Sequence, residues 1–201
     1  MEILKMPVLA NQYYSVVNEK KYIFLHHTSG SNAASAVAYW NSKPDRVATP
    51  YIIERSGEIF ETFDPKYWAY ALGVKGGTLL EKASIHIELV AWGGLSTKEG
   101  KFFTYTGKEI KGQDVTFLKE PWRGYSYFHK YTDEQIESLH LLLDRLRSNF
   151  FIPHNIINRN NFWQFRDFKT LPHGIWSHTT VRKDKSDICP QDNLVEMVKN
   201  L

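Results

Sequence analysis

Short apolar runs and strict alternation along the chain predict several β-strands. Residues 22–26 read YIFLH, an apolar run of the length expected for a buried strand. A second apolar run, GIWS at residues 174–177, has the same character. Residues 84–90 alternate instead, so that successive side chains point to opposite faces of a sheet. One face of this strand carries Ile85, Ile87 and Leu89, and the other carries Ser84, His86, Glu88 and Val90.

Two segments combine helical periodicity with a start signal. Asn32 can cap a helix over residues 33–40, because its side-chain oxygen can accept a hydrogen bond from a free N–H group of the first turn. Residues 132–135 read TDEQ, a capping box that predicts the start of a longer helix ending near Phe150. Its apolar positions follow at steps of three and four residues: Ile136, Leu139, Leu143 and Leu146. A last helix is predicted over residues 193–199.

Turn residues predict two hairpins. Ser56 and Gly57 lie between the apolar segments 51–55 and 58–63, and this pair suits a two-residue hairpin turn. Residues 102–109 predict a second hairpin, within a stretch rich in Gly, Lys, Thr and aromatic residues.

These elements predict an α/β fold, a single domain whose central mixed β-sheet is flanked by helices. With 201 residues, of which 42% are apolar, the chain can form one domain with a proper core. Residues 1–20 are expected to form an N-terminal leader packed on this domain. Residues 21–201 are expected to form the domain itself, with an insertion at about 96–130.

Composition narrows the functional classes. The formal net charge is +3 with basic and acidic residues intermixed, and no basic stripe indicates nucleic-acid binding. The single cysteine, Cys189, excludes an intrachain disulfide. No run approaches the roughly 18 apolar residues of a membrane span, and the first residues lack the layout of a signal peptide. We expect a monomer that is made in the cytoplasm, without a membrane span and without a nucleic-acid partner.

Three distant segments carry residues that can bind a metal ion. His26 and His27 end the first apolar run, His178 follows the second, and Asp187 and Cys189 lie in the loop beyond it. Zinc is bound by imidazole, carboxylate and thiolate groups, and a catalytic zinc keeps three protein ligands and one position for water. Because adjacent strand residues face opposite ways, only one of His26 and His27 can point into a given site.

Glu88 is the most informative residue of the alternating strand. A carboxylate within a sheet is costly unless it is paired or works as a base. An exposed strand face is the alternative interpretation of this residue.

The order of these motifs resembles the zinc-dependent N-acetylmuramoyl-L-alanine amidases, the family of phage lysozyme-type amidases and peptidoglycan recognition proteins. In that family an apolar strand ends in a zinc-binding histidine followed by His-Thr, as in FLHHT at residues 24–28. The family hairpin YxIxRDGxIxQ corresponds to YIIERSGEIFE at residues 51–61, and the strand SIGIEL to SIHIEL at residues 84–89. The closing motif, H…KxDPGP or H…KxCP, corresponds to His178 and to KSDICP at residues 185–190.

The resemblance implies Zn²⁺ bound by His26, His178 and a third ligand, which is Asp187 or Cys189 because family members use either type. We favour Asp187, since the family's catalytic lysine lies two residues before the third ligand, as Lys185 does here. The implied reaction is hydrolysis of the amide between N-acetylmuramic acid and L-alanine in peptidoglycan or a muropeptide.

The resemblance also implies the catalytic residues. Glu88 corresponds to the carboxylate that some members use as general base, whereas others use a tyrosine where this chain has Thr49. Lys185 corresponds to the catalytic lysine. Candidate substrate-binding residues are Trp68, Trp92 and His27.

Two departures from the family pattern concern the surroundings of the site. Ala71 stands where the family often has a histidine near the substrate, and His86 replaces the glycine of SIGIEL. These changes leave open a non-catalytic peptidoglycan-binding module of the same fold. For a catalytic protein, the expected role is that of a phage endolysin, a virion-associated lysin or a cytoplasmic recycling amidase.

Overall fold

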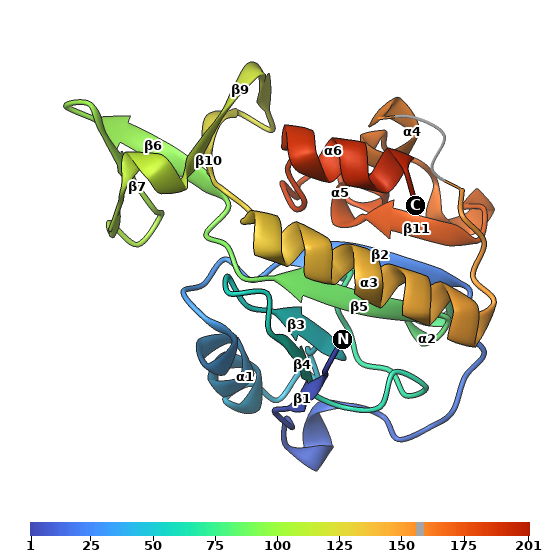
Figure 1. The fold of residues 1–201 in the computed structure, drawn as a ribbon. Helices are drawn as coiled ribbons and strands as arrows, with labels where there is room; N and C mark the ends of the chain where they lie inside the picture. The colour runs from blue at the N-terminus through green and yellow to red at the C-terminus, as the bar shows by residue number, and fades with distance from the viewer. Residues whose placement is uncertain (156–158) are drawn as a thin grey trace.

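A six-stranded mixed sheet forms the centre of the protein, in a computed structural model that describes residues 1–155 and 159–201. The predicted α/β fold with a central mixed sheet is confirmed (Figure 1). Along the sheet, the strands follow one another as β1 (Leu4–Lys5), β4 (Ile59–Glu61), β3 (Tyr51–Ile53), β5 (Ser84–Leu89), β2 (Tyr22–His27) and β11 (Gly174–Ser177).

Four neighbouring strands, β3, β5, β2 and β11, run parallel to one another. Their carboxyl ends therefore meet at one edge of the sheet, where open α/β sheets bind ligands. The register places His26 of β2 beside Glu88 of β5 and Leu25 beside Ser177 of β11. Since His178 follows Ser177 directly, three segments far apart in sequence deliver polar side chains to the same place.

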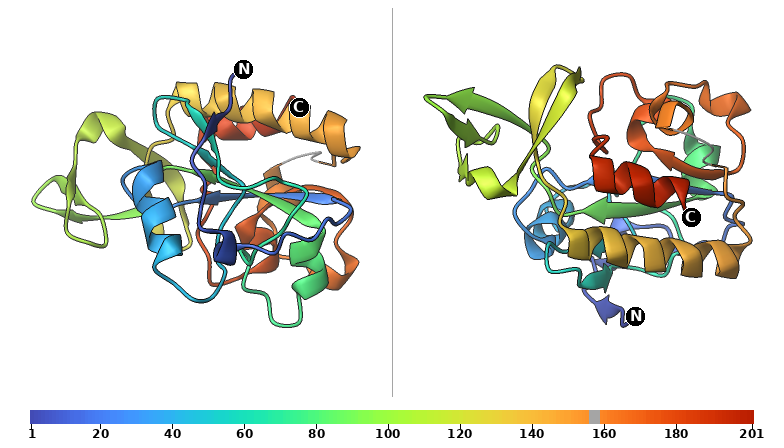
Figure 2. Two further views of the ribbon diagram at one scale, coloured as in Figure 1. Left: turned by 90° about the horizontal axis from the view of Figure 1, so that it is seen from below. Right: turned by 45° about the horizontal axis from the view of Figure 1, so that its top comes forward.

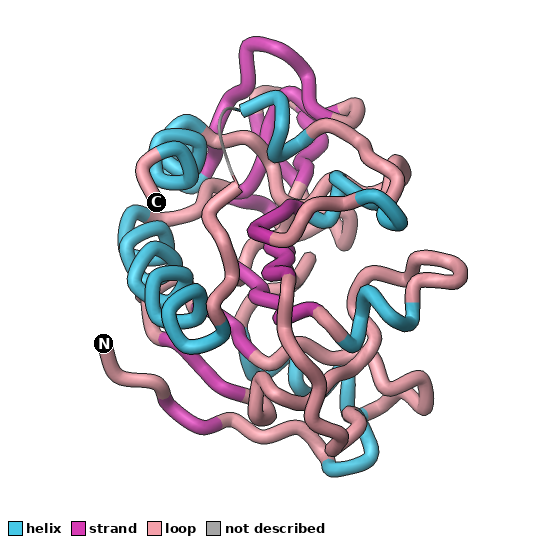
Figure 3. The backbone as a smooth tube through the Cα atoms, turned by 90° about the vertical axis from the view of Figure 1, so that its right-hand side faces the viewer, coloured by secondary structure: helices cyan, strands magenta, loops and turns pink. Residues whose placement is uncertain are grey.

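Two helices, α3 (Asp133–Phe150) and α6 (Asp192–Lys199), cover one face of the sheet. Figure 2 shows them on the side opposite α1 (Ala33–Asn41), and Figure 3 shows the sheet between the two layers. The predicted apolar face of β5 packs in this core with the apolar side of α3: Ile85, Ile87, Leu89, Ile136, Leu139, Leu143 and Leu146. Each such side chain contributes about 1.5–3 kcal/mol when fully buried.

Both predicted helix starts are confirmed. The Asn32 side chain accepts a hydrogen bond from the Ser35 N–H group, and Thr132 forms a capping box with Gln135. Gln135 also joins α3 to the sheet, because its side-chain amide donates to the carbonyl oxygens of Ile53 and Val90, each at 3.1 Å.

On its other face the sheet is covered by shorter elements and loops. Apolar side chains of α1 pack on β3 and the end of β5, and those of α2 (Thr78–Lys82) and α5 (His178–Val181) pack near β2 and β11. The remaining short helices are η1 (Ala10–Gln12), η2 (Gly112–Asp114), α4 (Arg159–Trp163) and η3 (Phe168–Thr170). Among the described residues, none of the helices has the length and apolar character that a membrane crossing requires.

A second, antiparallel sheet lies between β5 and α3 in the chain and projects from the central sheet (Figure 1). Its order is β8 (Glu109–Ile110), β7 (Lys101–Phe103), β6 (Gly94–Lys98), β10 (Tyr125–His129) and β9 (Val115–Trp122). Strands β7 and β8 form the hairpin predicted over residues 102–109.

One local prediction needs correction. The turn between β3 and β4 has three residues rather than two, because the Glu54 N–H donates to the Glu58 carbonyl and extends the ladder by one pair. Gly57 then takes a positive φ of 88°, which glycine adopts without strain. Helix α4 and the short helix η3 lie between α3 and β11 in the chain, and residues 156–158 lie outside the described part.

Residues 1–20 run along the outer strands of the sheet. Strand β1 pairs in parallel with β4, and the Tyr14 backbone bridges to Trp68. Lys20 is buried, and its ammonium donates to the carbonyl oxygens of Tyr67, Lys82 and Ser84 at 2.7, 2.8 and 3.1 Å. These bonds fasten the start of β2 to the start of β5.

Candidate metal centre

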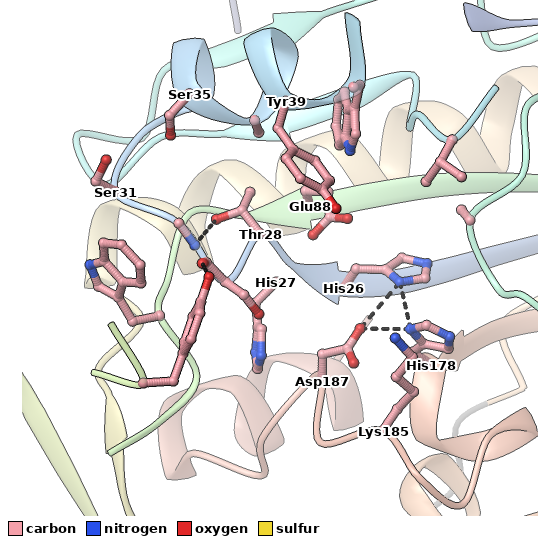
Figure 4. Close-up of a pocket in the computed structure, with 18 of the residues that line it drawn as sticks. His26, His27, Thr28, Ser31, Ser35, Tyr39, Glu88, His178, Lys185 and Asp187 are labelled. Carbon is pink, nitrogen blue, oxygen red and sulfur yellow. Dashed lines mark hydrogen bonds and ion pairs between the residues drawn. The ribbon is translucent and has the colours of Figure 1, made fainter. Parts of the chain in front are cut away.

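An open cleft of about 550 Å³ lies at the carboxyl ends of the parallel strands. Most of the predicted site residues line it: His26, His27, Glu88, His178, Lys185 and Asp187. The loop after β2, helix α1 and the second sheet form its walls, through residues that include Ser29, Tyr39 and Tyr105. Figure 4 shows these side chains converging from elements that are far apart in the sequence.

Three predicted ligands meet at the cleft floor (Figure 4). His26 Nδ1 lies 3.0 Å from His178 Nδ1 and 3.2 Å from Asp187 Oδ2. The third side of this triangle, from His178 Nδ1 to Asp187 Oδ2, measures 2.8 Å. In a tetrahedral zinc site with bonds of about 2.0–2.1 Å, ligand atoms lie roughly 3.3 Å apart. The triangle is therefore close to the size that such a site needs.

In both imidazoles the Nε2 atom has a partner away from the cleft, and the two Nδ1 atoms face each other. His178 Nε2 lies 3.0 Å from the Leu72 carbonyl oxygen, which can only accept, so Nε2 carries a proton. His26 Nε2 lies 3.0 Å from His86 Nδ1. Outer contacts of this kind fix the orientation of metal-binding histidines. The donor set fits a zinc ion.

Burial and neighbouring charges shift the pKa values of His26 and Asp187 in the directions that favour binding of a cation. Burial, reinforced by His178, lowers the pKa of His26 to about 3, so its ring is neutral at physiological pH. Burial alone would raise the pKa of Asp187, but the charge and hydrogen bond of His178 outweigh it. They hold the pKa of this carboxylate well below its usual value, and it stays ionised.

Glu88 lies beside His26 in the register and also lines the cleft. Its Oε2 is buried and has no hydrogen-bond partner among the described residues. Burial, followed by the negative charge of Asp187, raises the pKa of Glu88 well above its usual value, and Lys185 opposes this shift. An unpaired carboxylate with a raised pKa, in a cleft, is suited to take up and release a proton.

Cys189, the alternative third ligand, lies elsewhere. It is fully buried in the core under α3 and α6, and it is not in the group of residues that could hold a metal. Burial raises the pKa of its thiol to about 12, so the metal-binding thiolate is disfavoured. The geometry brings Asp187 rather than Cys189 to the two imidazoles.

The three predicted substrate-binding residues have different surroundings. His27 and Trp92 line the cleft. Trp68 is not among the lining residues, because its ring is buried and stacks on Tyr14 with 4.1 Å between ring centroids. Tyr105 is a further cleft residue that no sequence motif marks; its ring meets Trp92 edge-on and its hydroxyl donates to the Ser29 carbonyl.

Fold and site together define an α/β protein with a candidate metal centre in an open cleft, at the carboxyl ends of parallel strands. The family model described as N-acetylmuramoyl-L-alanine amidase matches residues 17–192. The chain belongs to this family, and membership supports peptidoglycan amidase activity. No curated protein matches the chain in sequence.

Solved structures share the fold. The structure of PlyL is 15% identical with a TM-score of 0.55, over 92% of this chain and 85% of that chain. The catalytic domain of XlyA is 12% identical with a TM-score of 0.56, over 93% and 90%. The Staphylococcus aureus hydrolase AmiA, in complex with its ligand, is 11% identical with a TM-score of 0.56, over 99% and 82%. At these identities the likeness concerns the fold alone.

Proposed function

We propose that this protein is a zinc-dependent N-acetylmuramoyl-L-alanine amidase that cleaves the amide between N-acetylmuramic acid and L-alanine. The observation that carries the proposal is the triangle of ligand atoms from His26, His178 and Asp187 on the cleft floor. Zinc bound by these residues would acidify a water molecule and polarise the scissile carbonyl.

Glu88 and Lys185 would carry the proton and charge transfers. Water attacks the lactyl carbonyl carbon, and Glu88 takes a proton from it. Glu88 then gives this proton to the nitrogen of L-alanine, so that the C–N bond breaks and a carboxylate and a free amine form. The Lys185 ammonium would stabilise negative charge on the carbonyl oxygen, and losing such a donor costs about 3–4 kcal/mol of barrier.

The cleft walls would bind the rest of the substrate. Trp92 and His27 line the cleft and remain candidates for contact with glycan or stem peptide. The second sheet, which supplies Tyr105 to the wall, would act as an insertion of the catalytic domain that shapes substrate access. We propose a monomer as the active unit.

The test begins with metal content and products. Purified protein is expected to carry about one zinc ion, and a chelator should stop the release of stem peptides from cell-wall sacculi until zinc is restored. Free amino termini of L-alanine should appear with turnover. Zinc binding without product, from sacculi and from soluble muropeptides alike, would contradict the proposal and favour a binding module. The two substrates also separate a lysin from a recycling amidase.

Variants assign the roles of the residues. Asp187→Ala should lose zinc, whereas Cys189→Ser should keep it, because only Asp187 reaches the imidazoles. Glu88→Gln should keep zinc and its fold but lose turnover. A Glu88→Gln variant with full activity would show that another group is the base.

A further inference from the structure

A polar layer lies directly behind the two imidazoles. His86, on the strand next to His26, is buried, and its Nδ1 lies 3.0 Å from His26 Nε2. On its other side, His86 Nε2 lies 3.3 Å from Glu81 Oε2, within ion-pair distance although the ring N–H is not well aligned with that oxygen. A buried chain therefore leads from Glu81 through His86 to His26.

Glu81 is held by the backbone of a neighbouring loop. Its side chain is 2% exposed, and the carboxylate accepts hydrogen bonds from the N–H groups of Ala71, Leu72 and Gly73 at 3.1, 2.9 and 3.2 Å. Towards these three backbone N–H groups the Glu81 carboxylate acts as the acceptor.

The same loop reaches the second imidazole. The Leu72 carbonyl oxygen lies 3.0 Å from His178 Nε2 and also accepts from the Arg182 guanidinium at 2.9 Å. Glu81 holds the Leu72 N–H group, so it restrains the peptide segment whose carbonyl orients His178. The Glu81 carboxylate thus contacts both His86, which lies against the His26 ring, and the Leu72 backbone, which lies against the His178 ring.

The directions of the contacts between Glu81, His86 and His26 follow from Glu81, the acceptor at one end of this row. Because the Glu81 carboxylate only accepts, the His86 proton belongs on Nε2, and His86 Nδ1 is then an acceptor. His26 must donate to it from Nε2, which leaves the lone pair of His26 on Nδ1. That lone pair faces His178 Nδ1 and Asp187, where a cation would bind.

We propose that Glu81 and His86 are positioning residues for the metal centre: Glu81 orients His26 through His86 and orients His178 through the Leu72 backbone. The inference rests on the proposed function, because it assumes that the two rings bind zinc. The glycine that His86 replaces in the family motif has no side chain to accept from His26. The branch through His86 is therefore a feature of this chain's own sequence.

The experiment measures zinc affinity by competition with a chromophoric chelator, on the full chain. His86→Leu removes the acceptor at similar volume, whereas His86→Asn places an oxygen near the position of Nδ1. Glu81→Gln removes the negative charge of the side chain that contacts both His86 and the Leu72 backbone. Glu58→Gln, in the exposed β3–β4 turn, is the matched control, and circular dichroism checks the fold of each variant.

Losing an outer contact of a metal-binding histidine typically weakens metal affinity roughly 10- to 100-fold. We expect losses of this size in Glu81→Gln and His86→Leu, with recovery in His86→Asn. The absorption spectrum of the Co²⁺-substituted protein should change in the first two variants and return in the third. If Glu81→Gln does not fold, the two His86 variants decide.

Wild-type zinc affinity and an unchanged Co²⁺ spectrum in folded His86→Leu would overturn the positioning role and leave the proposed function intact. A wild-type chain that binds no zinc, or an Asp187→Ala variant that binds it normally, would instead overturn the proposed function. The two failures are therefore distinguishable.

Discussion

Acid should destabilise the metal-free protein through His129, at the end of β10. This residue is buried, and its Nδ1 accepts a hydrogen bond from the Trp92 backbone N–H at 3.2 Å. A protonated ring has no lone pair for this bond. Burial, followed by the charge of Arg55, lowers the pKa of His129 to about 4. Because Trp92 lines the cleft, the bond joins the second sheet to the candidate site.

The sign and size follow from linkage. The pKa of His129 is about 4 in the folded state, and that of an unfolded histidine is about 6.5. Between these values the unfolded state binds more protons, so stability falls as pH falls and is unaffected above about 6.5. At 1.36 kcal/mol per unit, the full loss is about 3 kcal/mol, of which about 2 kcal/mol falls between pH 7 and pH 5.

The assay compares the wild type with His129→Asn by urea denaturation at pH 7 and pH 5, in chelator. Asparagine can accept the Trp92 N–H through Oδ1 but does not titrate, so the variant should lose about 2 kcal/mol less than the wild type between these two pH values. Comparison within this pair removes the contribution of the other buried histidines. His140→Asn, on helix α3, controls for replacing a histidine elsewhere. Equal losses in the wild type and His129→Asn would refute the reasoning.

Three further predictions concern other residues. Metal-free Glu88→Gln should be more stable than the wild type at pH 7–8 in urea denaturation, with the advantage shrinking towards pH 4, because a raised carboxyl pKa stabilises the fold only while the group is protonated. Lys20→Met should lower the free energy of unfolding by about 3 kcal/mol, since three buried carbonyls lose their donor; a change under about 1 kcal/mol would contradict this. Trp92→Ala should raise KM for muropeptides roughly two- to tenfold with zinc content and kcat unchanged, and an unchanged KM would remove Trp92 from substrate binding.

The sequence predicted the elements whose signals are local. The alternation over residues 84–90 placed Ile85, Ile87 and Leu89 in the core, and the capping box placed the start of α3 at its observed position. The resemblance to the amidase family indicated which residues would converge, and the structure gives the physical reason, since the carboxyl ends of parallel strands share an edge. His26, His178 and Asp187 lie close together in the structure, and their role as metal ligands stays a prediction.

What the sequence could not predict depends on contacts between distant segments. Nothing local marks Glu81 as the acceptor for the loop at residues 71–73, or Lys20 as the donor to three carbonyls. Trp68 shows the same limit, since its aromatic ring suited a substrate groove but stacks on Tyr14. For the polar layer behind the imidazoles, the sequence offered one indication: His86 is a polar residue on the same strand face as Glu88.

The adjacent histidines of β2 have separate structural tasks because they face opposite sides of the sheet. The His26 ring meets Asp187 at the cleft floor, whereas His27 Nδ1 lies 3.0 Å from the Tyr131 hydroxyl. That hydroxyl accepts the Cys189 N–H at 3.2 Å, so Tyr131 links His27 to the segment that carries Asp187. A Cβ at Gly93 would lie 2.6 Å from His27 Nε2, and only glycine leaves room for the ring. His26 thus contacts the predicted third ligand directly, and His27 supports the backbone of the same segment from the opposite face.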